Sequence, residues 1–191
     1  MAQDMTEIRW HGRGGQGAKT AAQLVAQVAM EEGKQGQGFP EYGPERMGAP
    51  IRGFTRISGE PIRLHCPIEQ PDVVVVLDDS LLGMDAITEG TGNDTLFVVN
   101  SVRGPAEVRE KIGVSTGKVM TVNATGISID EIGRPIPNTP MIGALIKGTG
   151  CISMKTVKKN IEKKFLKKFG ERIAQGNVRA IERAHEEVKS E

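Results

Sequence analysis

The stretch Glu-Ile-Arg-Trp-His-Gly-Arg-Gly-Gly-Gln-Gly at residues 7–17 decides the fold of this chain. Its first five residues have the composition of a short strand, and a helix-forming segment follows at residues 17–32. Between them the glycines are spaced as Gly12-x-Gly14-x-x-Gly17, which lets the backbone turn sharply and brings the helix close to the strand. The amide N–H groups of such a turn, with the positive end of the helix dipole, form a site for a phosphate or carboxylate.

The rest of the chain alternates predicted strands with predicted helices. Apolar strands are expected at residues 73–77, 95–99 and 118–122, each followed by a helical segment. This alternation is typical of a doubly wound, mostly parallel sheet. A β-hairpin is expected over residues 53–58 and 61–66. We therefore predict an α/β, Rossmann-like fold with a β-hairpin insertion and a C-terminal helical tail.

The C-terminal tail, residues 153–191, is basic. It holds eleven Lys or Arg against six Glu, a net charge of +5, and the chain total of +1 leaves −4 for residues 1–152. Two amphipathic helices are expected, at 153–169 and 171–188. The first has seven lysines and an apolar stripe made of Met154, Val157, Ile161, Phe165 and Phe169. Because no long linker divides the chain, residues 1–191 are expected to form one domain.

The composition excludes several classes of protein. The 191 residues are 38% hydrophobic and 26% charged, as in a soluble globular protein. No apolar run approaches the roughly 20 residues that span a bilayer, and the start has no secretion signal. The two cysteines, Cys66 and Cys151, are far apart and form no CxxC motif. A cytoplasmic protein with no membrane partner is therefore expected.

A long loop between Pro40 and Gly53 carries charged side chains between rigid residues. It contains three prolines and three glycines. Arg46 and Arg52 are candidates to bind phosphates, and Glu41 and Tyr42 to face a ligand or a partner. The alternative is a surface loop stiffened by proline, with solvated charges. Loops of this length are often functional, which favours recognition.

Polar residues follow each predicted parallel strand. Right-handed crossovers place Asp78, Asn100, Asn123 and the glycine turn at the same carboxyl end of the sheet. Capping the helix that follows is the preferred role of the aspartate and of both asparagines. Asn138, in Asn-Thr-Pro, is likewise expected to cap a helix, whose exposed N-terminus would face an anion.

The glycine turn alone does not specify its ligand. A dinucleotide site also needs an acidic residue about 20 residues later, at the end of the second strand. Residues 35–39 contain none, and Gln16 places a polar side chain inside the turn. Phosphate binding and a purely structural turn both remain open, and ordinary NAD binding is less favoured than either.

Residues that suggest catalysis or metal binding are few. His11 ends the first strand beside the turn, where a hydrogen-bonded structural histidine is expected. His65 and Cys66 are neighbours on a predicted strand and would point to opposite faces. The chain has no CxxCxxC array, no Gly-Asp-Gly thiamine-type segment and no nucleophile–base signature. No catalytic or metal-binding residue is predicted, so the hardest chemistry of any enzyme containing this chain would occur elsewhere.

Four segments together resemble one family. They are Ile8–Gly17 (IRWHGRGGQG), Phe39–Pro50 (FPEYGPERMGAP), Pro71–Val76 (PDVVVV) and Ile136–Leu145 (IPNTPMIGAL). In order and over nearly the whole chain, they are similar to the gamma subunit of multisubunit 2-oxoacid:ferredoxin oxidoreductases, most of all the pyruvate enzyme (pyruvate synthase). The Phe39–Pro50 segment is far more specific than the glycine turn.

The resemblance implies a complex that converts a 2-oxoacid and coenzyme A to an acyl-CoA and CO2, passing electrons to ferredoxin. It implies partners, the alpha, beta and delta subunits, that hold thiamine diphosphate, Mg²⁺ and [4Fe-4S] clusters, with none of these in this chain. The gamma subunit would help to bind coenzyme A and hold the assembly together.

The resemblance also implies site residues. Arg13, Gly14, Gly15, Gln16 and Gly17 would contact coenzyme A through backbone N–H groups. Arg46 and Arg52 would bind its phosphates, and Asn138 would make a polar contact at a helix terminus. Residues 39–50 would equally serve as the interface to the thiamine-bearing subunits.

Two rival functions remain to be separated from this one. A free-standing, nucleotide-binding dehydrogenase would bind a nicotinamide cofactor alone, which the missing acid on strand two disfavours. A nucleic-acid-binding protein would use its lysine-rich helix, but the chain lacks the aromatic or groove-reading elements of such proteins.

Overall fold

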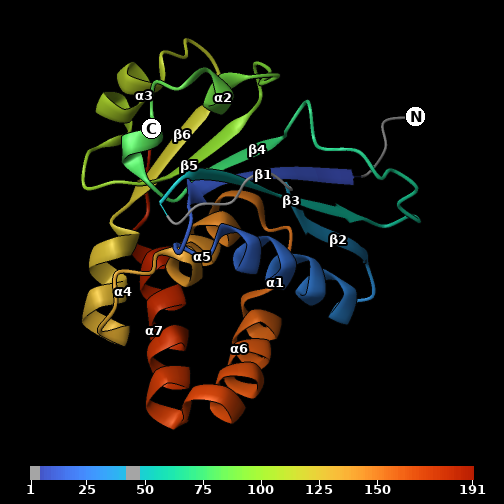
Figure 1. Cartoon of the computed structure of the whole chain (residues 1–191), viewed down its shortest axis with the longest axis vertical. Coiled ribbons are helices and arrows are strands. Elements are labelled where there is room, and N and C mark those ends of the chain that lie inside the picture. The colour runs from blue at the N-terminus through green and yellow to red at the C-terminus, as the bar shows by residue number, and fades with distance from the viewer. Residues whose placement is uncertain (1–4, 42–47) are drawn as a thin grey trace.

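The computed structural model describes residues 5–41 and 48–191. Its strands are β1 (Met5–Arg13), β2 (Gln35–Pro40), β3 (Pro50–Ser58), β4 (Val73–Val76), β5 (Leu96–Asn100), β6 (Lys118–Val122) and β7 (Lys189–Ser190). They form one seven-stranded sheet in the order β2-β3-β1-β4-β5-β6-β7 (Figure 1). The pairs β1–β4, β4–β5 and β5–β6 are parallel, and the remaining pairs are antiparallel.

Helices cover both faces of the sheet. They are α1 (Ala18–Glu31), the 3₁₀ helix η1 (Asp79–Leu81), α2 (Asp85–Thr88), α3 (Pro105–Ile112), α4 (Ala124–Ile132), α5 (Asn138–Thr149), α6 (Met154–Phe169) and α7 (Glu171–Glu187). In Figure 1, α1, α4, α5, α6 and α7 lie below the sheet, and α2 and α3 lie above it. This arrangement confirms the predicted doubly wound α/β fold with a mostly parallel centre.

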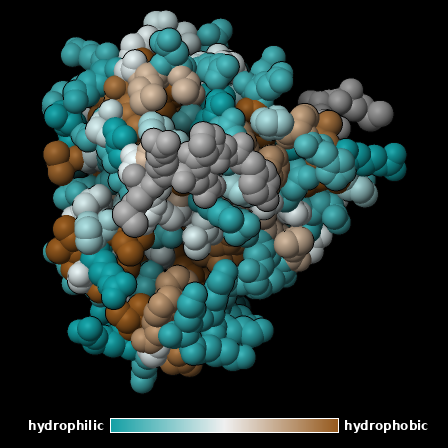
Figure 2. Space-filling view, viewed as in Figure 1, coloured by the Kyte–Doolittle hydropathy of each residue, from teal (hydrophilic) through white to brown (hydrophobic). Residues whose placement is uncertain are grey.

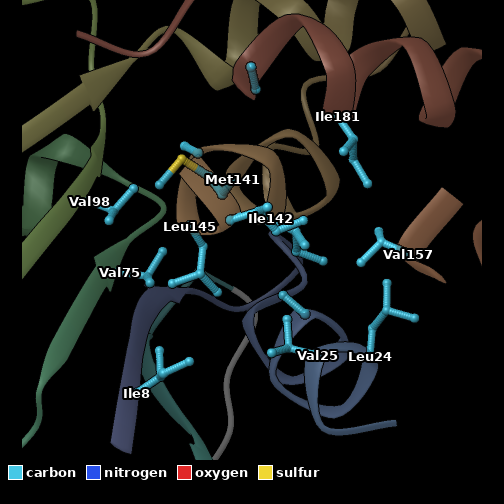
Figure 3. Close-up of a cluster of buried hydrophobic side chains, with 14 of the residues drawn as sticks. Ile8, Leu24, Val25, Val75, Val98, Met141, Ile142, Leu145, Val157 and Ile181 are labelled. Carbon is cyan, nitrogen blue, oxygen red and sulfur yellow. The ribbon is translucent and has the colours of Figure 1, made fainter. Parts of the chain in front are cut away.

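The larger core lies between the sheet and α5. Val75 and Val98 point from the sheet toward Ile142 and Leu145, and Ile181 of α7 packs behind them (Figure 3). The other face of β4 and β5 contributes a smaller core with α2 and α3. A strand buried on both faces needs apolar residues at every position, which explains the continuous valines of β4.

The β-hairpin forms from different strands than predicted. Its strands are β2 and β3, paired antiparallel from Gln35 opposite Ser58 to Pro40 opposite Gly53. Residues 61–66 form no strand. The physical reason is that β3 has only two edges, and β1 and β2 occupy both. The prediction of a hairpin was right, and its second strand at 61–66 was wrong.

Two glycines in β2 allow α1 to lie directly on this hairpin. A Cβ atom added at Gly36 would lie 2.2 Å from the carbonyl oxygen of Ala26, and one at Gly38 would lie 2.7 Å from that of Ala22. Such separations are far below van der Waals contact, so only glycine fits where the two backbones meet.

Helices α6 and α7 form an antiparallel hairpin that extends below the sheet in Figure 1. Val157 and Ile161 of the predicted apolar stripe are buried, whereas Phe169 at its end is 51% exposed. The stripe therefore covers the core along only part of its length. Among residues 5–41 and 48–191, no helix has the length and apolar character needed to cross a bilayer.

Candidate functional site

The glycine turn, residues 12–17, joins β1 to α1 at the carboxyl end of the sheet. Gly15 and Gly17 have φ angles of 101° and 84°, in the left-handed region that favours glycine. Gly17 is the N-cap of α1, and no side chain caps this helix. Within the described ranges, the N–H groups of Gly15 and Gly17 have no hydrogen-bond partner. The turn therefore presents two donors beside a positive helix terminus.

The side of the turn that faces β4 is closed. The Gln16 Oε1 atom accepts a hydrogen bond from the N–H of Arg13 at 2.7 Å, and its Nε2 donates to Asp78 Oδ2 at 2.6 Å. The N–H of Gly14 donates to the carbonyl oxygen of Ala49 at 2.9 Å. The prediction that Gln16 lies inside the turn is confirmed. The N–H groups of Arg13 and Gly14 are thus already used within the protein.

The Arg13 side chain ties the end of β1 to the residues after β4. Its Nε and Nη2 donate to Ser80 Oγ at 3.1 and 2.8 Å, and its Nη1 donates to the carbonyl oxygen of Gly48 at 3.1 Å. Nε also lies 3.4 Å from Asp78 Oδ2. Burial alone would raise the pKa of Asp78, but hydrogen bonds from Ser80 and Gln16 and the charge of Arg13 outweigh it and lower that pKa.

Asn138 lies against the glycine turn. A Cβ atom added at Gly17 would lie 2.5 Å from Asn138 Nδ2. The prediction that Asn138 caps α5 is wrong, because the N-cap is Pro137 and no side chain caps this helix. As a cap, Asn138 would face Pro140, which has no N–H, and Met141, whose N–H already donates to Pro137. The N-termini of α1 and α5 consequently meet at this point.

A hollow of about 240 Å³ lies beside the turn at the carboxyl end of the parallel strands. It is lined by Gln16, Leu77, Asp78, Asp79, Asn100, Ser101, Val102, Asn123 and Thr125. The prediction that Asp78, Asn100 and Asn123 share one end of the sheet with the turn is therefore confirmed. The walls of this hollow consist mainly of hydrogen-bonding groups.

Two of the three predicted caps on these strands are present. Asp78 accepts a hydrogen bond from the N–H of Ser80 at 3.0 Å, and Asn123 accepts one from the N–H of Gly126 at 3.0 Å. Asn100 is not a cap, because α3 begins five residues later, at Pro105. Its Nδ2 instead donates to the carbonyl oxygen of Leu77 and to the Thr125 hydroxyl, both at 2.8 Å. Asn100 thus links three neighbouring strand ends.

Arg52 lies on the face of the sheet opposite α1. It forms a two-point ion pair with Glu41, with distances of 2.6 and 2.7 Å, and donates to Glu89 at 3.2 Å. Arg52, Glu41 and His11 line a second hollow, of about 160 Å³. Of the other residues predicted in this loop, Arg46 and Tyr42 lie outside the described ranges.

His11 is a structural histidine, as predicted. It is 3% exposed, and its Nε2 accepts a hydrogen bond from Arg9 Nε at 3.0 Å. Burial, together with the charges of Arg9 and Arg52, lowers the pKa of His11 to about 3. The imidazole is therefore neutral at pH 7, and its pKa is too low for a general base.

Arg9 and Arg56 are buried charges that the sequence interpretation missed. Arg9 is 1% exposed and donates to the carbonyl oxygens of Ile87 and Glu89 at 3.2 and 2.7 Å. Arg56, also 1% exposed, donates to Glu7 Oε1 at 2.7 Å. The available signal was period-two alternation, which puts Arg9 on the face of β1 opposite Ile8 and Trp10, and Arg56 on the face of β3 opposite Ile57.

Over the described ranges, no group of three or more His, Cys, Asp or Glu side chains is placed to hold a metal ion. His65 and Cys66 lie in an irregular, exposed segment instead of on the predicted strand. Their predicted placement on opposite faces of a strand is therefore wrong.

Comparison with known proteins identifies the family. Residues 7–187 match the family described as pyruvate ferredoxin/flavodoxin oxidoreductase. The chain belongs to this family. It is similar to the pyruvate synthase subunit PorC of Thermotoga maritima, with 51% identity over 99% of this chain and 97% of the relative. It is 46% identical to the pyruvate/ketoisovalerate oxidoreductases common subunit gamma of Thermococcus kodakarensis, over 94% of this chain and 95% of that one.

Solved structures agree with this assignment. The crystal structure of pyruvate oxidoreductase subunit PORC from Thermotoga maritima has a TM-score of 0.88 and 47% identity, covering 98% of this chain and 99% of that one. A 2-oxoglutarate:ferredoxin oxidoreductase from Magnetococcus marinus, with 2-oxoglutarate, coenzyme A and succinyl-CoA bound, has a TM-score of 0.75 at 22% identity. That likeness covers 95% of this chain and 30% of that one and shows a shared fold. Within the family the chain is a gamma subunit of a multisubunit enzyme.

The topology of this gamma subunit also differs from that of a nicotinamide dehydrogenase. In those enzymes the second strand is a parallel neighbour of the first and carries the ribose-binding acid. Here β1 pairs with β3 and β4, and β2 lies at the edge of the sheet. The missing acid is therefore accompanied by a different position of the second strand.

Proposed function

We propose that this gamma subunit helps to bind coenzyme A in a pyruvate (2-oxoacid):ferredoxin oxidoreductase. That enzyme converts pyruvate, coenzyme A and oxidised ferredoxin to acetyl-CoA, CO2 and reduced ferredoxin. The alpha, beta and delta subunits hold thiamine diphosphate, Mg²⁺ and [4Fe-4S] clusters, and this chain supplies no catalytic residue. Its role is to position the anionic carrier and to hold the assembly together.

The observation that carries the proposal is the meeting of two uncapped helix N-termini at the glycine turn. Helices α1 and α5 are 14 and 12 residues long, and neither has a side-chain cap. The Asn138 side chain at the start of α5 contacts Gly17 at the start of α1. Each terminus carries a partial positive charge, and two together attract a phosphate more strongly than one.

Around the glycine turn, the side chains on the outer side favour an anion more than those on the side of Asp78 do. Asp78 is an acid, but Gln16 lies between it and the turn, and Arg13 neutralises its charge. On the outer side, Lys19 is exposed in the first turn of α1. A phosphate or pyrophosphate is therefore received by the N–H groups of Gly15 and Gly17, with Lys19 as a neighbouring cation.

The proposal also includes phosphate binding by Arg52 and Arg46, of which the structure describes Arg52. The guanidinium of Arg52 is held by Glu41, on the face of the sheet opposite α1. There it binds a phosphate of the carrier or, if residues 39–50 are the interface, a partner subunit. Substituting Arg52 with Ala separates these roles: a raised KM for coenzyme A supports the first, and a complex that dissociates with unchanged kinetics supports the second.

An isosteric substitution tests the helix termini. Asn138→Asp keeps the side-chain shape and adds a negative charge where α1 and α5 meet. We expect it to raise the KM for coenzyme A in the purified complex about fivefold, with the KM for pyruvate unchanged, because repulsion near a helix terminus is worth about 1 kcal/mol. The control is Asn93→Asp, an exposed asparagine before β5, at the opposite end of the sheet.

A charge reversal gives a second, independent measurement. Lys19→Glu is expected to raise the KM for coenzyme A about threefold, whereas Lys111→Glu, an exposed lysine on α3, leaves it unchanged. Unaltered coenzyme A kinetics in both the Asn138→Asp and Lys19→Glu complexes would remove the ligand-binding role of the glycine turn and the two helix termini.

A further inference from the structure

The hairpin of α6 and α7 ends in a rigid tip, defined here as residues 163–172. Gly170 alone connects the two helices, with a φ of 81° that favours glycine. Its N–H donates to the carbonyl oxygen of Leu166, and its own carbonyl oxygen accepts from Ala174, both at 3.2 Å. A one-residue connection held by hydrogen bonds on both sides fixes the direction of the tip.

The hairpin tip exposes large apolar side chains. Leu166 is 53% exposed and Phe169 is 51% exposed. The ring of Phe169 also lies 5.6 Å from that of Phe165, which is half-buried, so these aromatic residues form a continuous apolar surface. In Figure 2, hydrophobic and hydrophilic residues alternate at the lower end of the molecule, where Figure 1 places this hairpin. Apolar surface at the end of a projecting element is typical of an interaction site.

The surrounding charges are mainly positive, although Glu171 is an exposed acid within the tip. Helix α6 contains seven lysines and one glutamate. Four of the lysines are exposed at the hairpin tip: Lys163, Lys164, Lys167 and Lys168. Within the described ranges, only Lys158 of this helix forms an ion pair, with Glu182. The tip therefore combines an apolar centre with a positively charged border, the composition of a protein interface with an apolar core and a polar rim.

We propose that the hairpin tip docks into an acidic, partly apolar groove on a partner subunit of the oxidoreductase. A second copy of this chain that met the first tip to tip would bring an equally positive surface and be repelled. A nucleic acid would neutralise the lysines but leave Leu166 in water. Two apolar side chains bury too little surface for stable membrane anchoring. This inference rests on the proposed function, since it names one of the surfaces through which the gamma subunit holds the assembly.

The test compares two double variants in the complete complex, captured through a tag on another subunit. Leu166→Ser/Phe169→Ser removes the apolar centre. Met30→Ser/Ile129→Ser is the matched control, because those side chains are 52% and 50% exposed on α1 and α4. We expect the first variant to bind the other subunits at least about tenfold more weakly and the control to bind within twofold of wild type.

The charged border gives a second measurement. Lys167→Glu/Lys168→Glu is expected to slow association at low salt and to remove part of the salt dependence of wild-type binding. Circular dichroism melting of each isolated variant checks that it is folded.

Each other outcome overturns a stated claim. Equal retention of wild type and Leu166→Ser/Phe169→Ser in an assembled complex overturns the docking surface alone. Loss of binding in both the Leu166→Ser/Phe169→Ser variant and its Met30→Ser/Ile129→Ser control overturns the location of the docking surface at the hairpin tip. A dimer of the isolated chain that the tip variant abolishes identifies a second copy as the occupant and overturns the acidic groove. A wild-type chain that never joins thiamine- and cluster-bearing subunits overturns the proposed function, and with it the partner named here.

Discussion

The two faces of β1 are equally buried but differ in how they are stabilised. Ile8 and Trp10 are fully buried on the face that packs against α1. Arg9 and His11 alternate with them and are 1% and 3% exposed on the opposite face. The first face is stabilised by apolar area, which is non-directional. The second depends on particular hydrogen bonds, which must be complete because buried polar groups are destabilising when unpaired.

This difference separates two tasks within one strand. The apolar face holds the central helices against the sheet. The charged face attaches the end of α2 through the hydrogen bonds from Arg9 to Ile87 and Glu89, and it lines the smaller hollow with His11 and Arg52. Both faces end at the glycine turn, so both contribute to its position. Four substitutions test whether the two faces depend on different forces.

The largest effect is expected on the apolar face. Trp10→Ala should lower the free energy of unfolding by about 3–5 kcal/mol, since it leaves a large cavity and removes the hydrogen bond from Trp10 Nε1 to Thr55. Urea denaturation followed by far-UV circular dichroism measures this free energy. Tryptophan fluorescence cannot be used, because Trp10 is the one tryptophan of the chain and the variant lacks it. Trp10→Phe should lose much less. A loss below 1.5 kcal/mol for the alanine variant would mean that this face is not tightly packed.

A smaller loss of stability is expected from a substitution on the charged face. Arg9→Ala should lower the free energy of unfolding by about 2–3 kcal/mol, because the carbonyl oxygens of Ile87 and Glu89 and the Nε2 of His11 lose their buried donor. The comparison in the same denaturation assay is Arg109→Ala. Arg109 lies on α3, and its part-exposed side chain pairs with Glu191 at the C-terminus. Equal losses in the two variants would contradict a special role for the buried guanidinium.

The charged face should also respond to pH through His11. Its folded pKa of about 3 lies below the ordinary value of 6.5, so the unfolded chain binds more protons between these two pH values. Stability is therefore full above pH 6.5 and falls as the pH decreases toward 3. Between pH 7 and pH 5 this residue should account for a loss of about 2 kcal/mol.

Replacing the histidine isolates that contribution. His11→Gln keeps an acceptor for Arg9 and should remove about 2 kcal/mol from the stability difference between pH 7 and pH 5. His65→Gln, at an exposed position, should leave the difference unchanged. An unaltered difference in the His11 variant would show that the ring is protonated without loss of the fold.

The smallest effect is expected where the charged face reaches solvent. The ion pair of Arg52 with Glu41 is about one-third exposed on both sides, at 31% and 36%. Glu41→Gln should lower the free energy of unfolding by about 0.5 kcal/mol when the salt concentration is about 0.15 M or below. At higher salt the decrease should be smaller, because the ion pair is screened. A loss above 2 kcal/mol would place this pair with the buried network instead of at its border.

Local patterns in the sequence were sufficient for much of the fold and the site. The valines of β4 indicate a strand buried on both faces, and the glycine spacing at residues 12–17 predicts a turn before a helix. Both signals lie within a few neighbouring residues, so sterics and hydrophobic periodicity reveal them. The meeting of the strand ends also follows, because parallel strands with right-handed crossovers end on one side.

Other features depend on residues far apart in the chain. The partner of β3 is β2 instead of residues 61–66, since a strand has two edges and tertiary pairing decides which segments fill them. Asn138 was predicted as a cap, and its contact with Gly17 arises only when α5 enters the core beside α1. Buried Arg9 likewise needs carbonyl groups from α2.

By itself, the sequence determined the order and type of most of the strands and helices, the sharp turn at residues 12–17 and membership of the family. Only the tertiary structure decided which N–H groups of the turn are used internally, which helix termini converge on it and where the tip of α6 and α7 points. Backbone preference and apolar periodicity act between near neighbours, whereas hydrogen-bond partners and exposed surfaces are set by long-range packing.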